Sequence, residues 1–317
     1  MKDWDGLELA QRHPAWAKAC FGIRGTATNH FMGEGWWAWV IPLKDGDFSI
    51  GVVFDQRFVT WPEGGSVGQR PKDFLCRHPA GREILEQATW IEDDVHWRRN
   101  LAYKVSTRSG DGFVLTGDAA GFMDPFYSLG MDWLTFTTMR AVDLIAAQQT
   151  GKPLAAEIER YNRDFEVSYD RWFDAIYRDK NSYFGEYDLM RLAFLMDLGF
   201  YYLGVAAQPY RRGESALRES VFTTAPSIPF FHLMRTYNRR FAAIARQRQR
   251  RGATGRLNTG RRFLFGGFTF SLWSGRHLVV ALASWGWLEL TEGWRSWWRT
   301  SESKCPTAIL PSMVGKS

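Results

Sequence analysis

The residues best suited to chemistry lie in one short stretch, residues 116–130, which reads Thr-Gly-Asp-Ala-Ala-Gly-Phe-Met-Asp-Pro-Phe-Tyr-Ser-Leu-Gly. It combines a carboxylate, Asp118, with several small residues and with the start of a predicted helix. A carboxylate there can accept hydrogen bonds from hydroxyl groups, and bare amide groups at a helix start can hold an anion or an electron-rich ligand. The alternative is an ordinary strand–turn–helix connection that binds nothing.

The elements that would position this stretch are a short apolar strand at residues 112–115 and an apolar-periodic helix that begins at Met131. Further upstream, residues 35–43 and 48–54 are rich in β-forming side chains. An Asp-Gly turn between these two segments predicts a β-hairpin. We also expect a long strand across residues 93–106.

The second half of the chain has a different pattern from the first. Helices are predicted at residues 131–149, 153–180, 185–204, 214–222 and 226–251. Before them, the predicted strands alternate with a helical segment at residues 66–89 that breaks at His78-Pro79. These patterns together predict the α+β class.

Composition is that of a folded protein, since the 317 residues are 45% hydrophobic and 23% charged. The chain has an unusual aromatic load, with 16 Trp and 23 Phe. Its three cysteines, Cys20, Cys76 and Cys305, are too few and too far apart for a disulfide framework or a metal site. They are typical of a reducing compartment, so we expect a cytoplasmic protein that binds no metal.

The net charge of +6 is concentrated in one region, because the stretch from Arg235 to Arg262 contains arginines and no acidic residue. No nucleic-acid recognition motif accompanies it, so we expect no nucleic-acid partner. An anionic membrane surface, a phosphate-bearing ligand, an acidic partner or a solvated helix face would each fit. The apolar run that follows is interrupted by Arg276 and His277, which favours peripheral membrane contact over a membrane span.

Two motifs together resemble a known family. The Gly-Asp-Ala-Ala…Asp-Pro…Ser-x-Gly pattern of residues 117–130 resembles the second flavin-binding motif of the FAD-dependent monooxygenase superfamily. Upstream, residues 37–42, Trp-Ala-Trp-Val-Ile-Pro, match the Trp-x-Trp-x-Ile-Pro signature of its flavin-dependent halogenase branch, which includes the tryptophan halogenases. The resemblance covers roughly residues 20–150 and is much weaker in the helical tail.

The resemblance implies a role for each motif, with FAD as the cofactor. Asp118 would accept hydrogen bonds from the ribityl hydroxyls, and the small residues beside it would let the backbone approach the cofactor. The amide groups of Leu129 and Gly130 would hold a halide ion. Trp37 and Trp39, which alternation places on the same face of a strand, would act as catalytic residues between flavin and substrate. The other residues expected to contact FAD are Gly117, Ala119, Ala120, Gly121, Asp124, Pro125 and, again, Gly130.

The activity implied by the resemblance is that of an oxidoreductase, a flavin-dependent halogenase. Halide would be oxidised through a flavin hydroperoxide and would then halogenate an electron-rich, aromatic or lipid-like small molecule. A separate flavin reductase would supply reduced FAD. In this reading residues 1–111 form the substrate-side sheet and helices, residues 112–150 the FAD-contacting strand, loop and helix, and residues 151–317 a helical region.

Three departures from the family pattern leave alternatives open. No glycine-rich βαβ unit opens the chain, so we expect a truncated FAD-monooxygenase-like fold without the N-terminal dinucleotide-binding segment. Tyr127 replaces the glutamate of the tryptophan halogenases, and Leu129 replaces a small hydroxyl residue, which makes free tryptophan a poor substrate. A flavin monooxygenase, a geranylgeranyl-reductase-like enzyme and a non-catalytic truncated binding subunit are the alternatives.

Overall fold

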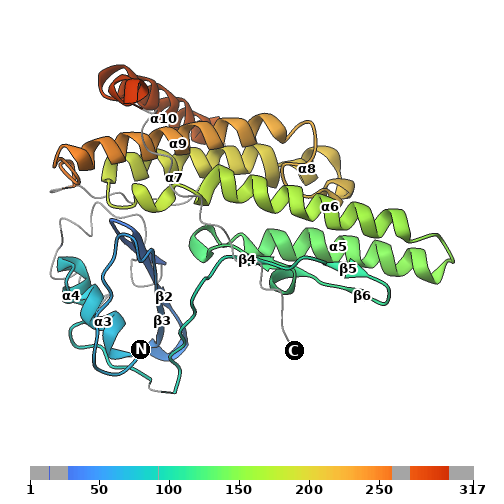
Figure 1. Ribbon diagram of the computed structural model, residues 1–317, viewed down its shortest axis with the longest axis horizontal. Coiled ribbons are helices and arrows are strands. Elements are labelled where there is room, and N and C mark those ends of the chain that lie inside the picture. The colour runs from blue at the N-terminus through green and yellow to red at the C-terminus, as the bar shows by residue number, and fades with distance from the viewer. Residues whose placement is uncertain (1–13, 15–27, 92, 259–271, 300–317) are drawn as a thin grey trace.

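The computed structural model describes residue 14 and residues 28–91, 93–258 and 272–299. A small antiparallel sheet with two short helices lies beside a layered body of long helices (Figure 1). The prediction of an α+β fold is confirmed. Cys76 is half-buried, whereas Cys20 and Cys305 lie outside the described residues.

The predicted hairpin is present with nearly the expected bounds. Strands β2 (Trp36–Pro42) and β3 (Phe48–Phe54) pair antiparallel, and β1 (Asn29–Gly33) adds to the free edge of β2. In the turn, Asp45 and Gly46 both have positive φ, 62° and 80°. Two consecutive residues of this conformation give the tight turn that the right-handed twist of paired strands favours.

The two faces of this sheet pack against different parts of the chain. Trp37 and Trp39 face the long helices and the 116–130 loop, whereas Ala38 and Val40 lie in a second hydrophobic cluster. Helices α3 (Gln69–Leu75) and α4 (Pro79–Leu85) complete that second cluster. The predicted sharing of one face by the two tryptophans is therefore confirmed.

The prediction of a long strand across residues 93–106 is wrong. Only β4 (Tyr103–Lys104) is a strand there, and it pairs with β7 (Gly121–Phe122). Residues 93–99 carry several exposed charges, and Asn100 has a φ of 52°, which an extended strand does not allow. The predicted strand at 112–115 is shorter than expected: β6 (Phe113–Val114) pairs with β5 (Ser109–Gly110).

In the described part of the chain, five long helices form the helical body, and the predictions for most of them are confirmed. They are α5 (Gly130–Gln149), α6 (Ala155–Trp172), α7 (Tyr187–Tyr201), α9 (Ile228–Arg250) and α10 (Leu272–Thr291), with the short α8 (Gln208–Arg212) between α7 and α9. The predicted helix at 214–222 is only a 3₁₀ segment, Glu214–Arg218. Helix α10 lies on the outer side of α7 and α9, away from the sheets (Figure 1).

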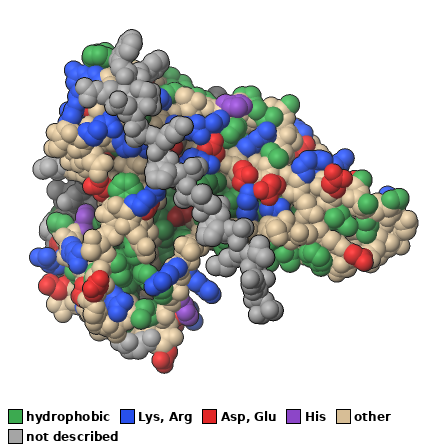
Figure 2. Space-filling model, in the orientation of Figure 1, with side chains coloured by type: hydrophobic (Ala, Val, Ile, Leu, Met, Phe, Trp, Pro, Cys, Tyr) green, Lys and Arg blue, Asp and Glu red, His purple; other side chains and the backbone are tan. Residues whose placement is uncertain are grey.

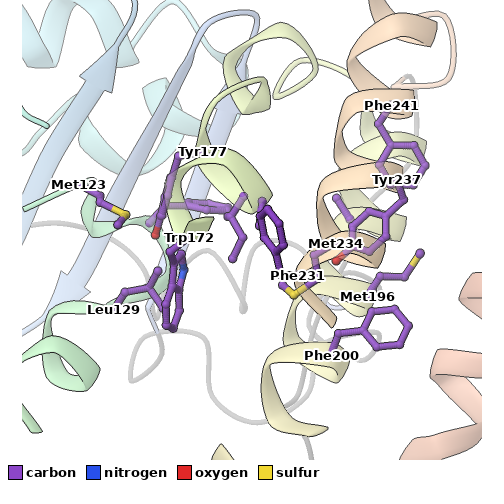
Figure 3. Packing of buried hydrophobic residues seen from close by; sticks show 14 of the residues in the cluster. Met123, Leu129, Trp172, Tyr177, Met196, Phe200, Phe231, Met234, Tyr237 and Phe241 are labelled. Atoms are coloured by element: carbon purple, nitrogen blue, oxygen red, sulfur yellow. The ribbon is translucent and has the colours of Figure 1, made fainter. Parts of the chain in front are cut away.

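One hydrophobic core joins the sheet, the loop and the helices. Figure 3 shows Met123 and Leu129 beside Trp172 and Tyr177, while Met196, Phe200 and Tyr237 meet between α7 and α9. The segment Tyr187–Arg212 is long and apolar enough to cross a membrane, but half of its most apolar window is buried inside the protein. Because this segment packs against both α9 and α10, it is a core helix of the body.

Candidate functional site

The 116–130 loop is anchored to α5 at Gly117. This glycine has a φ of 52°, and its amide donates a 2.9 Å hydrogen bond to the buried Thr137 Oγ1. A side chain at position 117 would also approach Leu134 Cδ1 to 3.3 Å. A positive φ and close packing make glycine the residue that fits here.

Asp118 lies at the exposed end of this turn, beside the first residue of α5. Its main-chain carbonyl accepts a 2.6 Å hydrogen bond from Tyr103 Oη. Its Oδ1 lies 3.6 Å from where a Cβ at Gly130 would stand. Among the described residues no side chain or amide bonds to the Asp118 carboxylate. The carboxylate is therefore available to accept hydrogen bonds from a ligand.

The small residues after Asp118 differ in what surrounds them. Ala119 is exposed, whereas Ala120 is completely buried. A side chain at Gly121 would meet the Tyr103 carbonyl at 3.1 Å and the Phe165 ring at 3.3 Å. In this structure the small size of Ala120 and Gly121 serves packing against β4 and α6, while Asp118 and Ala119 form the accessible part of the turn.

Asp124 shapes the second half of the loop. Its Oδ1 accepts a 2.9 Å hydrogen bond from the Phe126 amide, which caps a 3₁₀ turn that starts at Pro125. Burial raises the pKa of Asp124 to about 6, and the Phe126 amide, the Trp37 indole and Lys180 oppose this shift only in part. Asp124 therefore holds the loop and titrates close to neutral pH.

The loop ends with two amide groups that point to no acceptor in the described part of the chain. Ser128 has a φ of 56°, and α5 starts directly after Leu129. No hydrogen bond from the amides of Leu129 and Gly130 is present among the described residues. Two neighbouring free amides at the start of a twenty-residue helix attract negative charge. This is the position at which the sequence predicted a halide.

The tryptophan strand lies directly against this loop. The Trp37 ring packs on Phe126 with ring centroids 5.0 Å apart, and His30 stacks on Trp37 at 5.5 Å. Trp39 lies 5.5 Å from Trp37, and its indole donates a 3.1 Å hydrogen bond to Ser49 Oγ. The structure thus brings together the two motifs that the sequence placed far apart.

A buried polar network, which the sequence did not predict, supports the loop from behind. Tyr127 Oη donates a 2.7 Å hydrogen bond to Asp197 Oδ2, which also forms a 2.5 Å ion pair with Lys180 Nζ. Asp197 Oδ1 accepts from Tyr237 Oη at 2.6 Å and from Asn238 Nδ2 at 2.9 Å. Lys180 and Asp197 are 1% and 2% exposed. The signal that could have revealed this network is a single acid, Asp197, within the apolar run of α7.

Burial shifts the pKa values of the ionisable groups in and beside this network. Burial lowers the pKa of Lys180, and Asp197 opposes that change. Burial also raises the pKa of Tyr127 well above its ordinary value, so the phenol stays protonated and donates to Asp197. On the other side of the loop, burial raises the pKa of Asp132 to about 6, although Tyr201 Oη bonds to it at 2.8 Å.

Comparison with known proteins agrees with this geometry. Residues 23–179, which include both the tryptophan strand and the loop, match the family model for tryptophan halogenase. This segment belongs to the tryptophan halogenase family. The chain is 27% identical over 138 residues to a tryptophan 2-halogenase of Chondromyces crocatus and 34% identical over 120 residues to a sulochrin halogenase of Aspergillus terreus.

These matches cover only part of each halogenase. The aligned residues make up 43% and 37% of this chain but only 26% and 22% of the two relatives. Among solved structures, halogenase PltM superposes with a TM-score of 0.55 at 15% identity, covering 90% of this chain and 56% of PltM. A PltM mutant in complex with FAD gives a TM-score of 0.56 at 16% identity. The structural likeness establishes the shared fold, and the role of each site residue stays a prediction.

Proposed function

We propose that this chain supplies the flavin-contacting loop and the substrate-side sheet of an FAD-dependent halogenase-like oxidoreductase. The observation that carries the proposal is the contact between the Trp37 strand and the Phe126 turn of the loop. That contact joins the two motifs of the halogenase family in one place. Family membership of residues 23–179 supports the same conclusion independently of the geometry.

The residues present fit one part of FAD, its polyhydroxylated ribityl chain and the ring attached to it. Asp118 offers an exposed carboxylate without a partner in the described chain, and the neighbouring Ala119 is also exposed. Charge-assisted hydrogen bonds from hydroxyl groups to such a carboxylate are short and strong. When bound, FAD would supply the oxidising chemistry, while the loop holds and orients it.

The amides of Leu129 and Gly130 fit a halide ion as the second ligand. They carry the partial positive charge of the α5 N-terminus, and Asp132 in the first turn of the helix is neutralised as the pH falls below about 6. The Asp118 carboxylate beside Gly130 limits how closely an anion can approach. The halide therefore belongs on the Leu129 side of the helix start.

The tryptophan strand would form the wall between these ligands and an electron-rich aromatic or lipid-like substrate. Trp37 is buried and fixed by Phe126 and His30, so it supports this wall rigidly from within, while the half-buried Trp39 presents the accessible apolar surface. Tyr127 stands where the tryptophan halogenases carry a glutamate, and its hydroxyl is committed to Asp197. The proposal also includes a separate flavin reductase that supplies reduced FAD, and a cytoplasmic location for this protein.

Titration of the purified chain with FAD, followed by flavin fluorescence, tests the proposal. Asp118→Ala should weaken FAD binding about 10- to 150-fold, because a hydrogen bond to a charged group contributes roughly 1.5–3 kcal/mol. The matched control is Asp111→Ala, which removes an exposed carboxylate from the nearby β5–β6 turn and should leave affinity unchanged. A wild-type chain that binds no FAD below about 1 mM would contradict the proposal for this chain.

A further inference from the structure

The outer face of α10 is unusually apolar for a surface helix. Its inner face packs on α7 and on Tyr237 of α9. The opposite face carries large side chains that are mostly in solvent: Val280 at 58%, Trp287 at 69% and Leu290 at 75% exposure. Trp294, in the 3₁₀ segment Gly293–Arg299, continues the row at 49%. We call these four residues the apolar ridge; the spacing of Val280, Trp287 and Leu290, seven and three residues, places these three on one side of α10.

No free carboxylate accompanies the apolar ridge in the described segment 272–299. Its two acidic residues, Glu289 and Glu292, both turn inward. Glu289 forms an ion pair with Arg240 at 2.7 Å, and Glu292 pairs with Arg248 at 2.9 Å. The exposed face of α10 therefore carries apolar and basic groups without the acidic residues that normally balance a solvated helix surface.

A basic pocket lies at the end of the ridge, where α9 and α10 both finish. It is lined by Arg248, Arg251, Ala253, Arg256, Thr291, Glu292 and Arg295. Arg248 is tied by three carboxylates and Arg256 by one. Arg251 and Arg295 are exposed and have no carboxylate partner among the described residues. Figure 2 shows basic side chains gathered over this end of the molecule.

We propose that the apolar ridge and the basic pocket form a docking surface for an anionic lipid bilayer. Tryptophan and leucine side chains insert at the boundary between headgroups and acyl chains, where the amphipathic indole ring is favoured. Arg251 and Arg295 then face lipid phosphates, which attract basic residues within a few ångströms of the membrane. The exposed arginines complement the negative charge of anionic lipids. This favours an anionic bilayer over an uncharged apolar partner.

The position of α10 in the fold suits this role. It is the outermost layer of the helical body, on the opposite side from β1–β3 and the 116–130 loop (Figure 1). A bilayer on the apolar ridge would leave the loop face open. Binding to lipid therefore does not depend on the flavin site, and the two can be tested separately.

Flotation of the full chain with vesicles tests this docking surface. We expect binding to vesicles of phosphatidylcholine mixed with phosphatidylglycerol, weak binding to phosphatidylcholine alone, and a decrease with added salt. The double variant Trp287→Ala/Leu290→Ala should lower partitioning at least about 10-fold through lost apolar contact. Arg251→Gln/Arg295→Gln should lower it about 10- to 30-fold, and only for the anionic vesicles.

Two control variants distinguish binding through this surface from non-specific vesicle binding through any exposed aromatic or basic residue. Tyr210→Ala removes an aromatic ring that is 89% exposed on α8, and Arg98→Gln/Arg99→Gln removes two exposed arginines near the sheet. Both controls should bind vesicles as the wild type does. Failure of the wild type to bind anionic vesicles at low salt overturns the proposal, as does binding that neither ridge nor pocket variant reduces. A dimer in light scattering that Trp287→Ala/Leu290→Ala dissociates would instead assign the ridge to a second copy of the chain.

Discussion

The buried ion pair between Lys180 and Asp197, behind the loop, gives a sharp prediction. The two side chains differ in how many other groups contact them. Without Lys180, Asp197 would keep three neutral donors, namely Tyr127, Tyr237 and Asn238. Without a charged Asp197, Lys180 would keep one hydrogen bond, to Asn238 Oδ1 at 3.1 Å, the faces of two tyrosine rings and the more distant Asp124. Removing the acid should therefore destabilise the protein more than removing the base.

The magnitudes follow from what remains buried in each variant. Asp197→Asn leaves a buried ammonium without its ion-pair partner, a loss that typically costs about 3–5 kcal/mol of the free energy of unfolding. Lys180→Met replaces the ammonium with an apolar chain of similar length and leaves a hydrogen-bonded carboxylate. We expect a loss of about 1–3 kcal/mol there, since each hydrogen bond to the charge is worth roughly 1.5–3 kcal/mol.

Urea unfolding at several pH values measures both effects. Burial lowers the folded-state pKa of Lys180 below its unfolded value, so the unfolded chain binds more protons between these two pKa values and stability rises with pH there. In Asp197→Asn that rise should start at lower pH, because the opposing carboxylate charge is gone. Lys180→Met should lack it. A loss in Asp197→Asn no larger than that in Lys180→Met, or equal pH profiles, would refute this reasoning.

Two further stability predictions concern the loop and the strand beside it. Asp124→Asn keeps an oxygen for the Phe126 amide but removes a group whose pKa burial raises to about 6 from 3.8. The wild type should lose up to about 3 kcal/mol of stability from this group as the pH rises from 4 to 7, so the variant should unfold at higher urea concentration at pH 8 but not at pH 4. Trp37→Ala should cost about 3–5 kcal/mol, because this side chain is 1% exposed, while the half-buried Trp39 should cost less when it is replaced by alanine. If the alanine variants of Trp37 and Trp39 unfold at the same temperature in thermal melts, Trp37 does not pack as described.

Much of the fold could be predicted where the determinants are local. Asp45-Gly46 fixes the hairpin because two residues of positive φ are needed, and alternation places Trp37 and Trp39 on one face. The long helices follow from their apolar periodicity. The strand expected at residues 93–106 fails because β-forming side chains need a partner strand, and only Tyr103–Lys104 finds one.

The site could be predicted only in part, for a physical reason. Residues 117–130 form one continuous motif, so their types alone indicated a ligand-holding loop. The support behind it depends on Lys180, Asp197 and Asn238, which lie on separate segments and meet only after the helices pack. Their contacts depend on tertiary geometry, which local patterns do not encode.

The measurement that tests the central claim most directly is an amide NMR titration of the isotope-labelled chain with FAD. We predict shifts in the Gly117–Ala119 turn and in the amides of Leu129 and Gly130, with α10 unaffected. Bromide added afterwards should move Leu129 and Gly130 further while Gly117 stays in place. Saturation with FAD that leaves both segments unchanged, or shifts only residues outside the loop, would contradict the assignment of this loop as a flavin site.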